Sequence, residues 1–295
     1  MLYKQNLLLG ALLILLSELM FASMGATVKA VTTALPSEMV VFMRCLFGLT
    51  LLIPLLWRGG LSKLRTQVLH LHLLRALAGV SAMFCFFYAL ANLALAEGML
   101  LKMTAPLFMP MIAWLWLREE FNSWVLLAVG FGFLGVVLVL DPTGEFKLIA
   151  LVGLLGGLFA AQAKVTVRRL GHTESSIRIV FYFTLISTLI SAIPALLNWQ
   201  APDPLQWGLL LLTGLLGTLG QLLMTRGYAI AAASRISPFT YFSVVFGAIY
   251  GYLFWDERLD LSFVAGALMI ALAGILAVGF KHFTKESLVN QVVKS

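Results

Sequence analysis

The sequence predicts an all-α membrane protein of ten transmembrane helices, arranged as two inverted five-helix repeats. Three observations carry this prediction: an apolar composition, ten apolar stretches of membrane-spanning length, and similarity between the two halves of the chain. Of the 295 residues, 61% are hydrophobic and only 11% are charged, whereas a soluble globular domain has roughly 25% charged residues. A chain of this length cannot bury so much apolar surface in a water-soluble core, so lipid must cover much of it.

The apolar stretches are each roughly 18 to 25 residues long, enough to cross a hydrocarbon layer of about 30 Å as a helix. The first stretch continues past the length of a signal peptide and nine more follow it, so we interpret it as an uncleaved first span. The connectors are short and contain turn residues. The ten stretches are 7–28, 39–57, 71–93, 95–117, 124–140, 148–167, 177–197, 205–225, 236–255 and 263–280.

The excess of basic residues, a formal net charge of +7 at pH 7, indicates cytoplasmic loops and not a nucleic-acid partner. The basic residues form short clusters between apolar runs, as the positive-inside rule predicts. If the N-terminus is cytoplasmic, the loops on its side hold most Lys and Arg, and the opposite loops hold mostly acids. We therefore expect both termini in the cytoplasm of a bacterial inner membrane. The clusters are Arg58 with Lys63 and Arg65, Arg168 with Arg169, and Lys281 with Lys285.

The second half of the chain resembles the first at a constant offset. Residues 116–121 resemble residues 254–259, which follow 138 positions later, and Gly79 falls on Gly217 at the same offset. Five spans per unit is an odd number, so the second unit must enter the membrane from the opposite side, as in many secondary transporters. The expected division is a first repeat over 1–143, a second repeat over 144–281, and a cytoplasmic tail over 282–295.

Several motifs in this order and spacing resemble the EamA family of the drug/metabolite transporter superfamily. The resemblance implies a central cavity lined by the first, third, fourth, sixth, eighth and ninth spans. It also implies movement of small metabolites, often export, by exchange or proton coupling. One departure is the pair Ser17-Glu18, where many members have an aromatic residue and a glycine. The motifs are Phe42-Met43-Arg44 with Gly48, Leu74-Arg75-Ala76, Tyr88-Ala89-Leu90, Ala105-Pro106 followed by Trp114 to Glu119, and Tyr252 to Glu257.

Glu18 is the first candidate site residue, because it lies about eleven residues into its span and therefore roughly 16 Å deep. A charge at that depth costs at least about 2.5 kcal/mol, so the side chain should be paired, protonated or facing water. A substrate-binding or proton-coupling role is one interpretation. A structural hydrogen bond from a permanently neutral acid is the other.

Arg44 and Lys102 are the cations expected to approach the cavity from the outer side. Either can bind a carboxylate or phosphate, and the fork of Arg44 can do so with two hydrogen bonds. Arg44 can instead reach toward the membrane surface or bond helix-end carbonyls. Lys102 and Glu18 can also simply neutralise each other when the outer side is closed.

Four further cations lie near the expected cytoplasmic ends of their spans: Arg75, Lys164, Arg226 and Arg235. Each can extend toward the membrane surface at little cost. Together they would make the inner mouth positive and attract anionic solutes.

Uncharged polar side chains complete the expected substrate-binding set: Tyr88, Gln162, Gln221 and Tyr241. They are candidates for orienting contacts in a cavity, and helix–helix hydrogen bonds are the alternative for the two glutamines. Glu119 and Glu257 end matching spans and are expected to cap helices or pair locally, with a gating role as the alternative.

We therefore expect a secondary transporter for a small anionic or zwitterionic metabolite, and the resemblance implies export as its direction. No catalytic motif is found, and the four histidines lack metal-site spacing, so we expect no enzyme activity, metal or cofactor. A membrane enzyme acting on lipid-linked substrates and a non-transporting scaffold are the alternatives. The expected partners are the metabolite and the lipid bilayer, and the chain is expected to be a monomer or a homodimer.

Overall fold

In the part of the chain that the computed structural model describes, helices are joined by turns and irregular connections, which confirms the all-α prediction. The described residues are 7–59, 64–117, 127, 130–135, 138, 148–171, 173–230, 237–273 and 276, and no strand occurs among them.

The helices follow the apolar stretches of the sequence closely. Their bounds are α1 Leu7–Val31, α2 Ser37–Gly59, α3 Leu69–Asn92, α4 Leu95–Lys102, α5 Ala105–Leu117, α7 Leu148–Leu170, α8 Ser176–Leu197, α9 Pro204–Ile230, the 3₁₀ helix η2 Ser237–Tyr241, and α11 Phe242–Trp255. A further apolar helix covers Leu261–Ala273. The expected fifth span, 124–140, falls largely outside the described residues, so the number of ten spans stays a prediction.

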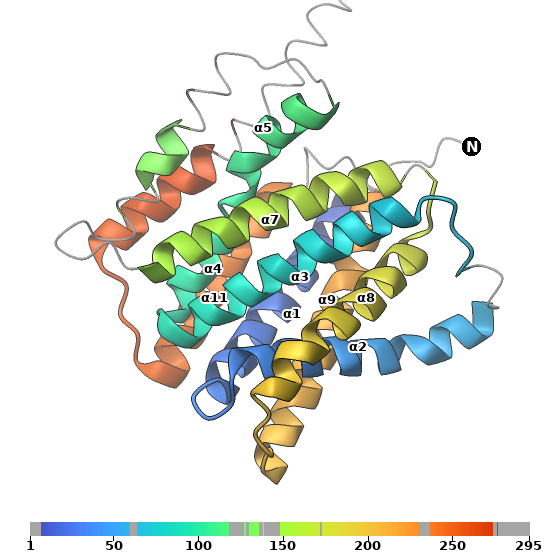
Figure 1. Ribbon diagram of the computed structural model, residues 1–295. Helices are drawn as coiled ribbons and strands as arrows, with labels where there is room; N and C mark the ends of the chain where they lie inside the picture. Colours follow the sequence, from blue (N-terminus) through green and yellow to red (C-terminus); the bar gives the residue numbers. More distant parts are fainter. Residues whose placement is uncertain are drawn as a thin grey trace, which may run out of the picture.

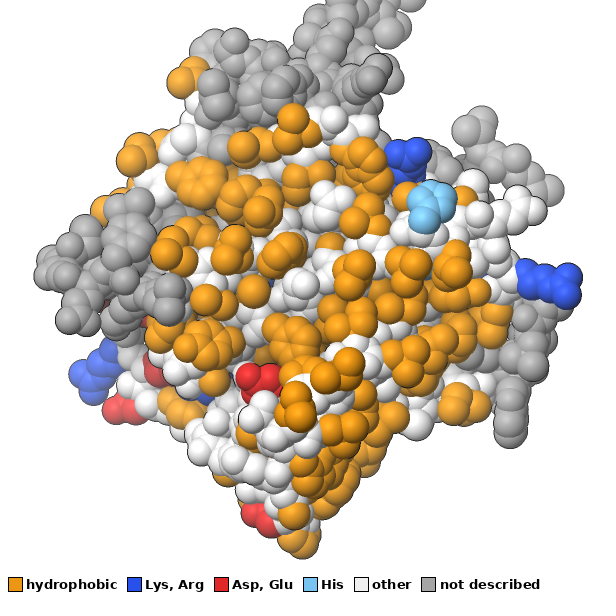
Figure 2. Space-filling view, in the orientation of Figure 1, with side chains coloured by type: hydrophobic (Ala, Val, Ile, Leu, Met, Phe, Trp, Pro, Cys, Tyr) orange, Lys and Arg blue, Asp and Glu red, His pale blue; other side chains and the backbone are white. Residues whose placement is uncertain are grey.

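The surface of the helices is that of a protein in lipid. Five helices, within α1, α2, α3, α8 and α9, are each long and apolar enough to cross a membrane. Large hydrophobic side chains point outward along them, including Leu189, Ile193 and Leu211. Figure 2 shows a face on which hydrophobic side chains predominate and charged side chains are few. Such a surface is stable only against an apolar solvent.

The bundle is held together by helix pairs that are distant in sequence. The most extensive contacts join α1 to α9, α3 to α7, and α2 to α8. Figure 1 shows α3 running between α7 and α8, and α11 beside α4. The main apolar core lies among these helices and includes Met39, Phe87 and Leu100.

Glycines on one face of α9 allow it to approach α1 and α2 closely. A Cβ added at Gly214 would lie 2.5 Å from the Cβ of Phe47, and one at Gly220 would lie 2.8 Å from the ring of Phe21. Such distances exclude any larger residue without movement of the helices. Small residues at this spacing are typical of close helix packing in membranes.

The fourth apolar stretch is broken in the middle. Helix α4 ends at Lys102, Met103 and Thr104 form a turn, and α5 begins at Ala105. Pro106 allows the break, because it has no backbone N–H and so cannot donate the helical hydrogen bond to the carbonyl of Lys102 four residues earlier. The break places Lys102 at a helix end inside the bundle, where a cation is also favoured by the helix dipole.

Candidate functional site

An acid and a base meet inside the bundle at the break between α4 and α5. Glu18 projects from the middle of α1, and its Oε2 lies 3.8 Å from the Nζ of Lys102. The Glu18 side chain is 3% exposed and the Lys102 side chain 21%. Oε2 of Glu18 makes no hydrogen bond to any described residue. The two side chains therefore form a long ion pair without a hydrogen bond between them. The Oε2 atom of Glu18 can still accept a hydrogen bond from another group.

Lys102 is held over two aromatic rings. Its Nζ lies 4.4 Å from the ring centroid of Phe21 on α1 and 5.6 Å from that of Phe86 on α3. These distances fall within the range of cation–π attraction. The ammonium of Lys164, on α7, lies close enough to act electrostatically on both Glu18 and Lys102. One carboxylate and two ammonium groups thus form a cluster, the Glu18 cluster, with an excess of positive charge.

Two arginines form a second buried group. The guanidinium carbon of Arg44, on α2, lies 5.7 Å from the ring centroid of Phe183 on α8, and that of Arg75, on α3, lies 3.8 Å from the same ring. Arg44 donates one hydrogen bond, from Nη2 to the carbonyl of Gly217, at 3.3 Å. Arg75 is 6% exposed and is directed into the bundle, alongside Gly79. This direction differs from the alternative in which Arg75 extends toward the membrane surface.

The uncharged candidates are spread more widely. Tyr88 is 40% exposed, and the hydroxyl of Tyr241 donates to the carbonyl of Ile270 at 3.3 Å, which ties η2 to the last described helix. Gln162 contacts Thr166 within α7, while Gln221 follows Gly220 on α9 and is half-buried. Arg226 is exposed. Arg235 and Glu119 lie outside the described residues.

At one end of the bundle, Glu257 joins the two halves of the chain. Its Oε1 lies 2.6 Å from the Nζ of Lys29 at the end of α1, and its Oε2 accepts a hydrogen bond from the backbone N–H of Leu95 at the start of α4. Lys29 also donates to the carbonyl of Leu93 at 2.6 Å. Glu257 thus contacts residues far from it in sequence, where the sequence indicated a local cap. Lys29 was not among the expected site residues.

At the opposite end, Glu174 joins the loop before α8 to the chain before α3. It accepts hydrogen bonds from Arg178 at 2.7 Å and from Thr66 at 3.0 Å, and lies 3.7 Å from His72 Nε2. Burial raises the pKa of Glu174, but the hydrogen bonds from Arg178 and Thr66 and the charge of Arg178 lower it more, so that the pKa lies below its ordinary value. Sequence reasoning missed this group because Thr66 and His72 lie more than 100 residues before Glu174.

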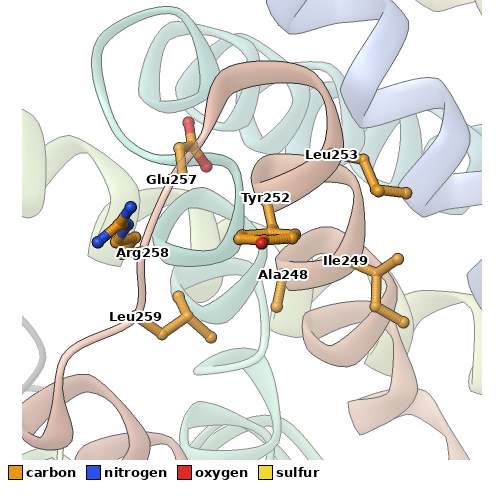
Figure 3. Close-up of a pocket in the computed structure, with 7 residues that line it drawn as sticks. All are labelled: Ala248, Ile249, Tyr252, Leu253, Glu257, Arg258 and Leu259. Carbon is orange, nitrogen blue, oxygen red and sulfur yellow. The ribbon is translucent and has the colours of Figure 1, made fainter.

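A pocket of about 450 Å³ lies outside this interior, against α11 and the loop after it. Figure 3 shows Tyr252 and Leu253 on the helix and Glu257, Arg258 and Leu259 on the loop. Its apolar side chains are well exposed, with Tyr252 at 61%, and none of the expected substrate-binding residues lines it. The pocket is therefore separate from the Glu18 cluster. Among the described residues, no three His, Cys, Asp or Glu side chains group as metal ligands.

Buried charges inside an all-helical, lipid-compatible bundle define a class of protein, the multi-pass membrane transporters, because intramembrane ionisable groups mark solute or ion pathways. The chain belongs to the EamA-like transporter family, which matches residues 8–141 and again residues 147–279. The family assignment expected from the sequence motifs is thereby confirmed.

Relatives that match nearly the whole chain are named as transporters. The pseudopaline exporter of Pseudomonas aeruginosa is 36% identical over 273 residues, which cover 90% of this chain and 94% of that protein. The riboflavin transporter of Vibrio cholerae is 30% identical, covering 85% and 86%. The S-adenosylmethionine uptake transporter of Rickettsia bellii is 28% identical, covering 85% and 86%. One solved crystal structure is similar in fold, with a TM-score of 0.64 at 18% identity, covering 91% of this chain and 96% of that one.

Proposed function

We propose that this protein is a secondary active exporter of a small anionic or zwitterionic metabolite and works by alternating access. The observation that carries the proposal is the Glu18 cluster, in which a carboxylate and two ammonium groups lie inside an apolar bundle at a broken helix. Ionisable groups are retained at such a position, in spite of their cost, where they bind a solute or carry a proton. Discontinuous helices commonly form the binding sites of secondary transporters.

The positive excess of the interior supports an anionic or zwitterionic solute. Lys102 and Lys164 outnumber Glu18 in the cluster, and Arg44 and Arg75 add two further buried cations. Cationic side chains bind carboxylates and phosphates through charge-assisted hydrogen bonds. The relatives named above differ in solute and in direction, and the 36% identity to an exporter supports export.

The packing supports two inverted repeats, each of five spans. Exchanging the two halves turns the pair of α1 with α9 into the pair of α7 with α3, and both pairs are among the most extensive in the bundle. Glu174, just before α8, contacts Thr66, just before α3, so these two helices start at the same end. Helix α8 therefore runs opposite to α2, its counterpart in the first half.

The two polar groups at the ends support alternating access. The bonds of Glu257 to Lys29 and Leu95 join the halves at one end, and those of Glu174 to Thr66 join them at the other. Breaking one set at a time would open the interior to one side only. With the termini in the cytoplasm of the inner membrane, the Glu257 end would face outward and the Glu174 end inward. A monomer or a homodimer is compatible with this mechanism.

The test begins with ligand-dependent stability of the purified protein. Amino acids, dicarboxylates, pseudopaline, riboflavin and S-adenosylmethionine are screened for a rise in unfolding temperature, because a ligand of the folded state stabilises it. A solute that stabilises the protein is then loaded into proteoliposomes, and its flux is measured with a pH gradient and with external solute.

Glu18→Gln separates the two modes of coupling. If Glu18 carries the proton, this variant loses flux driven by the pH gradient and keeps solute exchange; if Glu18 binds the solute, both are lost. Glu38→Gln, at the start of α2, is the matched control and should keep wild-type flux. Reconstituted protein that moves no stabilising solute under any gradient would contradict the proposal.

A further inference from the structure

Arg44 and Arg75 are a pair of buried cations without an acidic partner. They are 3% and 6% exposed, and no carboxylate of the described part of the chain lies within ion-pair distance of either one. The Nε atoms of both side chains are buried and find no hydrogen-bond acceptor there. Both guanidinium groups lie within 6 Å of the ring centroid of Phe183, so like charges are held close together.

The structure makes room for this pair. A Cβ added at Gly217 would lie 2.8 Å from the Nε of Arg44, and one at Gly79 would overlap the end of Arg75. These are the two glycines that match between the halves of the sequence at an offset of 138. Each admits one arginine to the interior, so the pair depends on corresponding positions of α3 and α9.

The partners that the two arginines do have are weak. The ring of Phe183 supplies cation–π attraction, the carbonyl of Gly217 accepts one hydrogen bond from Arg44, and the thiol of the neighbouring Cys45 is a further, weak partner of Arg44. Burying a charge without a counter-charge is strongly unfavourable, and bringing two together adds repulsion. One turn beyond Phe183 on the same face of α8, the hydroxyl of Ser187 is also fully buried and has no partner among the described residues. The two guanidinium groups and the Ser187 hydroxyl therefore have hydrogen-bond donors available for one negatively charged group.

We propose that Arg44 and Arg75 together bind one carboxylate of the transported solute, with Ser187 as an additional hydrogen-bond donor. Guanidinium groups match the planar geometry of a carboxylate with two parallel hydrogen bonds, which an ammonium cannot provide. This inference rests on the proposed transport function and assigns part of its solute specificity to a second subsite.

The arginine subsite is separate from the Glu18 cluster but faces the same interior. On α9, Gly217 contacts Arg44 and Gly220 contacts Phe21, the ring under Lys102, so about one helical turn separates the two sites there. On α3, Gly79 and Phe86 are seven residues apart, which is roughly 10 Å along the helix. The preferred solute would then have two polar ends, one carboxylate on the arginines and a second group at Lys102.

The arginine subsite also lies next to the Glu174 group along α3. Arg75 follows His72 by one turn of α3, and His72 lies 3.7 Å from Glu174. Tyr182, whose ring packs against that of His72 with centroids 4.5 Å apart, is adjacent to Phe183. Release of the Glu174 contacts would therefore expose the arginines before the Glu18 cluster.

The test measures thermal unfolding of the purified full-length protein during titration with sodium succinate and sodium acetate, against sodium chloride at matched ionic strength. The carboxylates should raise the unfolding temperature of the wild type with saturation. Arg44→Gln and Arg75→Gln should each weaken the apparent affinity at least about tenfold, because each removes charge-assisted hydrogen bonds. Arg169→Gln, at an exposed arginine that lies over Trp116 on the outside of the bundle, should keep the wild-type affinity.

Arg75→Lys keeps the charge and removes the fork, so it should fold and bind carboxylate more weakly than the wild type. Equal stabilisation by chloride, or wild-type affinity in the Gln and Lys variants, would overturn the inference. Because binding is measured without flux, the two proposals fail differently. Carboxylate binding without any transport contradicts the proposed function, and transport with unchanged carboxylate binding in the arginine variants contradicts the subsite.

Discussion

The charged residues of the bundle differ in whether the fold brings an oppositely charged side chain close to them. Glu18 has Lys102, Glu257 has Lys29, and both contacts join segments that are distant in sequence. The depth of Glu18 and Lys102 follows from counting residues along an apolar run, so the sequence predicts that these two charges lie inside the membrane. The direction of a side chain depends on its neighbours across the bundle. Arg75 shows the difference, because room beside Gly79 and the ring of Phe183 turn it inward.

Glu174 makes the stability of the protein depend on pH. Its pKa lies below its ordinary value in the folded state, so the folded protein binds this proton more weakly than the unfolded chain. The carboxylate therefore contributes stability above its ordinary pKa, and this contribution is lost as the pH falls through the folded pKa. The side chain is 4% exposed, but it lies in the loop at the end of the bundle, so solvent screens part of its interaction with Arg178.

Glu174→Gln should accordingly lower the free energy of unfolding by about 1–2 kcal/mol at neutral pH, because it removes charge-assisted hydrogen bonds. It should also flatten the fall in stability between neutral and acidic pH. Thermal unfolding of the wild type and the variant across this range measures both effects, with Glu38→Gln as the control. An equally steep acid profile in Glu174→Gln would assign the pH dependence to other groups.

Among the helices, α4 and α5 show that one apolar run can contain a break that hydropathy does not predict. The run 95–117 predicts one continuous span, and the structure divides it after Lys102. Pro106 was visible in the sequence, but a proline inside a span does not by itself require a break. Helices α2 and α8 contain Pro54 and Pro194 and remain continuous. Packing around the freed carbonyl decides between a kink and a break, and packing is not local in sequence.

Pro106→Ala tests whether this break positions Lys102. Alanine restores a donor for the carbonyl of Lys102, so α4 and α5 should join. The free energy of unfolding should stay unchanged or rise by about 1 kcal/mol, and the unfolding temperature should follow it. Flux of the solute found by the stability screen should fall several-fold, since the ammonium moves away from Glu18. Pro194→Ala, in a continuous helix, is the matched control. Wild-type flux in Pro106→Ala would show that the break does not serve the site.

The whole molecule combines strong local signals with contacts that only the fold reveals. The positions of α1, α2, α3, α8 and α9 follow from hydropathy and length, because each must span lipid with its backbone hydrogen bonds satisfied internally. Their pairing depends on small residues and on side chains over 100 positions apart, which no single-sequence pattern specifies. The family match confirms the class of protein that the motifs indicated, while the inward and outward faces remain predictions.

The side of the membrane on which each loop lies can be predicted from two contacts between helix ends. Lys29 at the end of α1 bonds the carbonyl of Leu93 after α3, so these helices end together. Glu174 and Thr66 show that α3 and α8 start together. Residues after α1 and after α8 should therefore share one side of the membrane, and the loop before α8 should lie on the other. From the excess of Lys and Arg in the loops, we predict that the loop before α8 is on the cytoplasmic side.

Single cysteines in a background of Cys45→Ala and Cys85→Ala test this arrangement in intact cells. Thr33→Cys and Gln200→Cys, at exposed positions after α1 and α8, should react with a membrane-impermeant maleimide added outside. Thr173→Cys, exposed in the loop before α8, should react only after the membrane is permeabilised. Labelling of Thr33→Cys and Gln200→Cys from opposite sides would contradict the inverted repeat, since α8 would then run parallel to α2. Labelling of all three with inside and outside exchanged would retain the repeat and reverse the orientation.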